Sequence, residues 1–221
     1  MRRLPLLVMA VLAVGYAGAA YFLLLPPIPF TPRRALADLP PADCGSASFL
    51  AEIRRESEIL FVPLAQIPEQ VQTRVLQQED RSFYRHRGIN WPILWRALVR
   101  DLAAGEVKFG ASTLTMQLAR ELYLDKRRRV VRKLREMAYA VQLERRLSKE
   151  QILELYLNVV DWGPGLRGIG AASCYYFGVP PSALDAEQSA RLVALLPSPE
   201  RLGAILEQEL RSTPTPATTG A

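Results

Sequence analysis

Histidine and cysteine are scarce in this sequence, and common nucleotide-binding motifs do not occur in it. The 221 residues include one histidine, His86, and two cysteines, Cys44 and Cys174. A single histidine excludes a histidine-rich metal site, and two cysteines exclude a zinc ribbon or a disulfide-stapled miniprotein. Neither GxGxxG nor GxxxxGKS/T is found, so nothing indicates a nucleotide cofactor. Other side chains must therefore carry any chemistry.

Composition and charge are those of a folded, modestly basic protein. Apolar residues make up 49% of the chain and charged residues 23%, which is enough apolar material for a buried core. Lys and Arg number 28 against 22 Asp and Glu, and the net charge is +6. This balance suits an anionic partner: a phosphate-bearing substrate, an anionic membrane surface or nucleic acid.

The N-terminal segment predicts a membrane anchor over residues 1–25. Leu4 to Leu25 carries no charge, and as a helix it would span about 33 Å, close to a bilayer core. Arg2 and Arg3 before it favour a cytoplasmic N-terminus and an exported remainder. A cleaved signal peptide is the alternative, because Ala17-Gly18-Ala19 resembles a cleavage site. The apolar run continues beyond that site, which favours the anchor.

The remainder of the chain predicts one all-α domain between two irregular segments. We expect a Pro-rich linker over 26–43, a domain over 44–210 and a disordered tail over 211–221. Most of the domain has helical spacing of apolar residues. Three helix starts are indicated: Pro68 as the first helical residue, and capping boxes at Ser148/Gln151 and Asp185/Gln188. The sequence leaves open whether Cys44 and Cys174 pair.

The first segment with chemical potential is 77–88, which contains Glu79 and Asp80. Glu79 follows Val71 and Val75 at helical spacing, so we expect it near the apolar face at the end of a helix. A carboxylate there is partly removed from water and has a like charge beside it, a setting that suits a general base. The alternative is an ordinary helix-ending acid paired with Arg81 or Arg85.

Two further segments suggest contact with an anion. In 110–120, small and hydroxylated residues follow a glycine, as at a helix start whose free N–H groups face an anion or a sugar. In 126–135, seven of ten residues are basic. On a helix, Arg128, Arg132 and Glu136 would share one face and could hold a diphosphate. The alternatives are a capped helix without ligand and a solvated basic face near lipid headgroups. A nucleic-acid surface is disfavoured for an exported domain.

Taken together, these segments resemble the peptidoglycan glycosyltransferases that polymerise lipid II. Glu79-Asp80-x-x-Phe83-x-x-His86-x-Gly88 is similar to the first signature of this family, and residues 110–120 are similar to the second. Arg132-Lys133-x-x-Glu136 resembles the third, and residues 149–158 resemble the fourth. The similarity runs from Ile59 to Pro199. One anchor and no transpeptidase domain indicate the monofunctional type.

The resemblance implies roles for individual residues. The glutamate matching Glu79 is the general base, and the one matching Glu136 is a second catalytic residue that helps to hold the diphosphate. Glu154 matches a glutamate that braces the fold. The substrate-binding positions implied are Asp80, Phe83, His86, Ser112, Thr113, Gln117, Arg120, Arg128, Arg132 and Lys133.

The resemblance also implies fold, cofactor, partners and location. The fold would be a lysozyme-like helical domain whose smaller apolar lobe dips into the membrane, with Trp91 and Trp95 nearby. No cofactor is required, although Glu136 could bind divalent Mg or Mn. The partners would be lipid II, the growing glycan strand, the membrane and cell-division or elongation proteins. The domain would lie on the periplasmic face of the bacterial inner membrane, anchored by a single pass.

Two departures from the family pattern support an alternative. Glu121 stands where asparagine is usual, which places an acid near the phosphates. The residues 201–210 look like an eroded remnant of a helix that carries a further motif in the family. Both features fit a weakly active or inactive scaffold that binds lipid II, whereas the retained Glu79 and Glu136 favour an enzyme. A lytic enzyme is a third reading, which the basic segment and the anchor disfavour.

Overall fold

The computed structural model is helical, with one small hairpin. It describes residues 44–45, 55, 59–104, 111–124 and 130–212. The predicted anchor, the linker up to residue 43 and the tail beyond 212 lie outside the described residues. Among the described residues, no helix combines the length and the apolar character needed to cross a membrane. The described chain divides into two compact units, 84–148 and 59–83 with 149–212.

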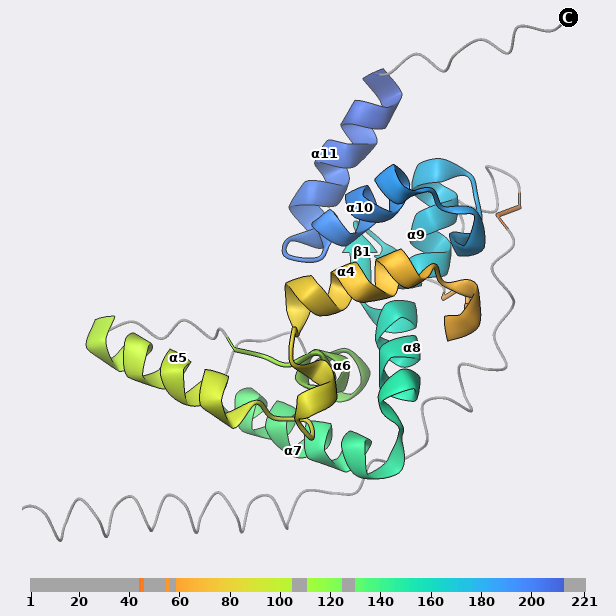
Figure 1. Ribbon diagram of the computed structural model, residues 1–221. Helices are drawn as coiled ribbons and strands as arrows, with labels where there is room; N and C mark the ends of the chain where they lie inside the picture. The colour runs from red at the N-terminus through yellow and green to blue at the C-terminus, as the bar shows by residue number, and fades with distance from the viewer. Residues whose placement is uncertain (1–43, 46–54, 56–58, 105–110, 125–129, 213–221) are drawn as a thin grey trace, which may run out of the picture. The chain divides into compact units, whose positions relative to one another are not determined.

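The described residues of the unit 84–148 form three α-helices, and η2 (Phe83–Arg85) lies at its boundary. The helices are α5 (Trp91–Ala104), α6 (Leu114–Tyr123) and α7 (Val130–Arg146). α6 and α7 pack against each other (Figure 1). The buried face of α6 includes Leu114, Met116 and Leu118, and that of α7 includes Ala138 and Leu143. This pairing positions the second and third signature segments beside each other.

The other unit holds the remaining elements. They are η1 (Leu64–Gln66), α4 (Glu69–Glu79), α8 (Lys149–Val159), β1 (Asp161–Gly163), β2 (Leu166–Arg167), α9 (Gly168–Phe177), η3 (Pro181–Ala183), α10 (Ala186–Leu195) and α11 (Pro199–Ser212). α8 is buried from Ile152 to Val159 and packs on α9, while α4 packs on α10 (Figure 1). β1 and β2 pair antiparallel, so the all-α prediction misses one hairpin.

All three predicted helix starts can be compared with the structure. Asp185 forms the predicted capping box with Gln188, whose backbone N–H lies 2.8 Å from the Asp185 carboxylate. α8 begins at Lys149, directly after Ser148. Pro68 is the N-cap of α4, so this helix begins at Glu69, one residue later than predicted. The difference is small because a helix boundary depends on where the first intrahelical hydrogen bonds form.

The C-terminal residues 199–212, which include the segment expected to be an eroded remnant, form the helix α11. α11 continues to Ser212, two residues past the predicted domain end. Gly203 lets the helix approach β1 and α9, because a Cβ there would lie 2.9 Å from the Gly163 Cα and 2.6 Å from the Tyr176 hydroxyl. Glu207 accepts a hydrogen bond from the Tyr175 hydroxyl at 2.8 Å. A residue without a side chain therefore allows α11 to dock closely.

Cys44 and Cys174 form a disulfide, which settles the pairing that the sequence left open. Their Cα atoms lie 4.9 Å apart across 130 residues of sequence. Cys174 is buried on α9 beside Leu60 and Ala171. The bond fastens the beginning of the described chain to the core of this unit. Disulfides persist in oxidising compartments.

Candidate active site

Glu79 is the last residue of α4 and is half-buried. Val71 and Val75 on the same helix are fully buried, so the predicted position of Glu79 near the apolar face is confirmed. The Gln78 amide nitrogen donates to Glu79 Oε1 at 3.2 Å and to the Val193 carbonyl oxygen at 2.9 Å. Gln78 therefore links the carboxylate to the end of α10. The sequence does not indicate this role of Gln78, because its partner Val193 is 115 residues away.

Asp80 and Phe83 are both buried in the same unit as Glu79. Asp80 caps the C-terminus of α4 through its backbone N–H, and its Oδ1 accepts from the Ser82 hydroxyl at 3.3 Å. The ring of Phe83 is covered by the Lys149 ammonium at 4.3 Å from the centroid. These contacts hold the turn that follows Glu79. His86, half-buried, comes after the boundary of the two units.

Gly88 connects the first signature to the second through the backbone. Its φ is +88°, and a Cβ there would lie 3.0 Å from the Ala140 carbonyl on α7. The Gly88 carbonyl oxygen accepts from the Thr113 hydroxyl at 2.6 Å. The same hydroxyl oxygen accepts from the Met116 backbone N–H at 3.1 Å and so caps α6. Thr113, a predicted substrate-binding residue, thus shapes the loop that presents Ser112.

The residue before Ser112 has an unusual backbone conformation. Ala111 has φ +73°, in the left-handed region that non-glycine residues rarely adopt. Such conformations persist only where surrounding contacts hold them, and they concentrate at functional sites. The strained residue places Ser112 at the start of α6, where the Ser112 hydroxyl meets α7.

Three predicted site residues on α7 and one before α6 form a hydrogen-bonded cluster. The Lys133 ammonium donates to Ser112 Oγ and to Glu136 Oε2, the latter at 3.0 Å. Arg132 Nη1 donates to the other Glu136 oxygen, Oε1. The Glu136 side chain is 1% exposed, whereas Arg132 and Lys133 keep 15% and 14%. We call Ser112, Arg132, Lys133 and Glu136 the cation cluster.

Within the cation cluster, Lys133 has a strongly shifted pKa. Burial, followed by the neighbouring charges of Arg120 and Arg132, lowers the pKa of Lys133 to about 8. Glu136 offsets this only in part, because one carboxylate faces two cations. A bound anion would relieve the repulsion, so the cluster is arranged to accept negative charge.

Arg120 and Gln117 lie on α6, next to this cluster. Arg120 is near enough for its charge to act on Lys133, and its Nε donates to the Glu121 carboxylate at 3.0 Å. Glu121, which the sequence reasoning placed near the phosphates, is 6% exposed and bound to Arg120. Gln117 is half-buried one turn into the helix. Arg128 lies outside the described residues.

Among the described residues, the side chains around Glu136 do not form a preformed divalent-metal site. Both Glu136 oxygens are occupied by cations. Within the described ranges, no group of three His, Cys, Asp or Glu side chains is placed to hold a metal ion. A divalent cation prefers several oxygen ligands, and here it would have to displace Arg132 or Lys133. The donor set fits an anion better than a metal.

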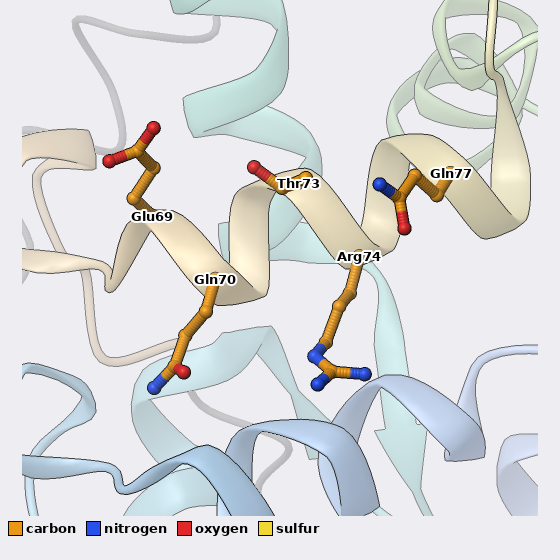
Figure 2. A pocket seen from close by; sticks show the side chains of 5 residues that line it. All are labelled: Glu69, Gln70, Thr73, Arg74 and Gln77. Atoms are coloured by element: carbon orange, nitrogen blue, oxygen red, sulfur yellow. The ribbon is translucent and has the colours of Figure 1, made fainter.

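A polar groove of about 410 Å³ lies along α4, away from the predicted site residues (Figure 2). Its lining side chains are Glu69, Gln70, Thr73, Arg74 and Gln77. Gln70 already donates to the Ser189 hydroxyl at 3.1 Å, across to α10. Val75 and Val71 occupy the opposite, buried face of the helix.

One unit of this helical protein carries the half-buried Glu79, and the other carries the cation cluster around the buried Glu136. A family model described as Transglycosylase matches residues 46–213, and the chain belongs to this family.

Glu154, expected to brace the fold, accepts a hydrogen bond from the Leu64 backbone N–H at 2.9 Å, so that expectation is confirmed.

Individual relatives within the family have more specific names than the family model. The chain is 39% identical over 139 residues to a biosynthetic peptidoglycan transglycosylase of Janthinobacterium sp. (strain Marseille), covering 63% of this chain and 60% of that protein. It is 40% identical over 141 residues to one from Azoarcus sp. (strain BH72), covering 64% and 61%. It is 39% identical over 153 residues to penicillin-binding protein 4 of Bacillus subtilis (strain 168), covering 69% and 24%. The chain thus spans about three fifths of the length of the two transglycosylases.

Proposed function

We propose that this chain is a peptidoglycan glycosyltransferase that polymerises lipid II into β-1,4-linked glycan strands and releases undecaprenyl diphosphate. The observation that carries the proposal is the cation cluster, in which the half-buried Lys133 and Arg132 share one carboxylate beside Ser112. A site where two cations share one carboxylate suits a diphosphate leaving group. Family membership and the names of the relatives point to the same chemistry.

In the proposed reaction, Glu79 acts as the general base. Its carboxylate takes the proton of the 4-hydroxyl of the acceptor sugar, and that oxygen attacks the anomeric carbon of the growing strand. The bond between this carbon and the diphosphate oxygen breaks, and the diphosphate leaves with the electron pair. The configuration at the carbon inverts. Gln78 holds the Glu79 carboxylate from the side of α10.

The cations stabilise the departing charge. Lys133 and Arg132 are fixed by Glu136 before substrate arrives, so little reorganisation is needed during the reaction. Arg120 and Arg128 complete the diphosphate site in this proposal. Because the cations occupy both oxygens of Glu136, we propose that the enzyme does not require a divalent metal.

We also propose that the enzyme works at the bacterial inner membrane, with residues 1–25 as a single-pass anchor and the domain on the periplasmic face. α5 supports contact with lipid. Trp91 and Trp95 are 63% and 66% exposed, and Leu98 and Val99 on the same helix are about half exposed. Exposed tryptophans are typical of the membrane–water interface. The Cys44–Cys174 disulfide suits an exported domain.

The test is polymerisation of fluorescent lipid II by the detergent-solubilised full-length chain, resolved on a gel. We expect a ladder of glycan products from the wild type and none from Glu79→Gln. Glu69→Gln is the matched control, because Glu69 is an exposed glutamate at the other end of the same helix. A ladder from the Glu79 variant would refute the base assignment. A folded wild type that binds lipid II without making a ladder would refute the enzyme and favour a scaffold.

A further inference from the structure

Glu121 lies where an acidic side chain is electrostatically unfavourable. It occupies the last turn of α6, where the helix dipole disfavours negative charge. Its side chain is only 6% exposed, so the carboxylate also loses most of its hydration. A carboxylate in such a position needs a specific cationic partner to stabilise its charge.

Arg120 is that partner. Its Nε donates to Glu121 Oε1 at 3.0 Å. Adjacent residues on a helix do not normally face each other, so this contact fixes one conformation of the Arg120 side chain, which is 32% exposed.

The position of Arg120 matters for the cation cluster. The charge of Arg120 acts on Lys133, which itself contacts Ser112 and Glu136. Arg120 pairs with Glu121, and Arg132 and Lys133 pair with Glu136, so three cations and two carboxylates lie in this region. One net positive charge remains on the five groups before any anion binds. Without Glu121 that charge would double.

We propose that Glu121 is a positioning residue that acts through Arg120: its carboxylate fixes the guanidinium beside the cation cluster and weakens the hold of the cluster on a diphosphate. This inference rests on the proposed function for its biological meaning. A leaving group that binds too tightly stays on the enzyme after the bond has broken. Glu121 therefore favours release of the diphosphate product at some cost in affinity.

The test is direct binding of inorganic pyrophosphate to the full-length chain in detergent, measured by titration calorimetry. Glu121→Gln keeps the size of the side chain and removes its charge. We expect its Kd for pyrophosphate to fall about fivefold below that of the wild type, because one nearby negative charge is lost. Glu121→Asp keeps the charge and should bind within about twofold of the wild type. A purely structural role would weaken binding in both variants.

Glu187→Gln is the matched control, because Glu187 pairs with Arg191 at 2.7 Å on an exposed surface. Its Kd should equal that of the wild type. If thermal unfolding shows that Glu121→Gln does not fold, Glu121→Asn replaces it, with the same expected direction. Unchanged or weaker binding in the uncharged variant, or no binding to the folded wild type, overturns the inference. Because the readout is binding, loss of the lipid II ladder refutes the proposed function separately.

Discussion

Deprotonation of Lys133 should lower the activity at alkaline pH, and a substitution of Lys133 should change that pH dependence. Its pKa is lowered to about 8, mainly by burial and then by Arg120 and Arg132. The side chain is therefore roughly nine tenths protonated at pH 7 and about one tenth at pH 9. If the charged ammonium is needed to hold the diphosphate, kcat/KM should fall about tenfold for each pH unit above 8.

The same shift has a consequence for stability. A fall from 10.5 to about 8 means that the charged form of Lys133 is disfavoured by about 3 kcal/mol in the folded state. The unfolded chain binds the proton more tightly than the folded chain between pH 8 and 10.5. The Lys133 contribution to the free energy of unfolding therefore rises with pH through that window.

The assay is the initial rate of lipid II polymerisation between pH 6.5 and about 10 for the wild type and Lys133→Arg. Arginine stays protonated throughout this range, so the alkaline fall should be absent from the variant if the variant retains activity at pH 7. Thermal unfolding at each pH checks that both proteins are folded. A wild-type rate that stays flat above pH 8, or the same fall in both proteins, would refute the reasoning.

Three further results are expected. Gly88→Ala should lower the free energy of unfolding by at least about 2 kcal/mol in chemical denaturation, because it combines φ +88° with a contact against Ala140; unchanged stability would contradict the close approach. Reduction of Cys44–Cys174 should cost about 2–5 kcal/mol, seen as a lower Tm that a Cys44→Ala/Cys174→Ala variant reproduces without reductant. Polymerisation in EDTA should stay within about twofold of the rate in Mg²⁺, because cations fill both oxygens of Glu136; complete loss would show that a metal displaces them.

Interactions over short sequence distances could be read before the structure was known. The Asp185–Gln188 capping box needs only four consecutive residues, and the apolar face of α4 follows from Val71 and Val75. The position of Glu79 at the end of that face follows from the same spacing. The signature motifs indicate the family and the candidate site residues.

Interactions between distant residues could not be read in this way. Gln78 contacts Val193, and Cys44 bonds to Cys174, across more than a hundred residues in each case. The docking of α11 likewise depends on Gly203, which approaches Gly163 and Tyr176 closely. Each of these contacts depends on which helices pack together.

The amino-acid sequence by itself determined the helical class, the helix starts and the family, because these depend on hydrogen bonds and apolar spacing within a few turns. Only the tertiary structure decided the electrostatics of the cation cluster. Lys133 and Glu136 are neighbours on α7, but their meeting with Ser112 and Arg120 depends on the packing of α7 against α6. That packing partly buries Lys133 near the charges of Arg120 and Arg132, and together these lower the pKa of Lys133.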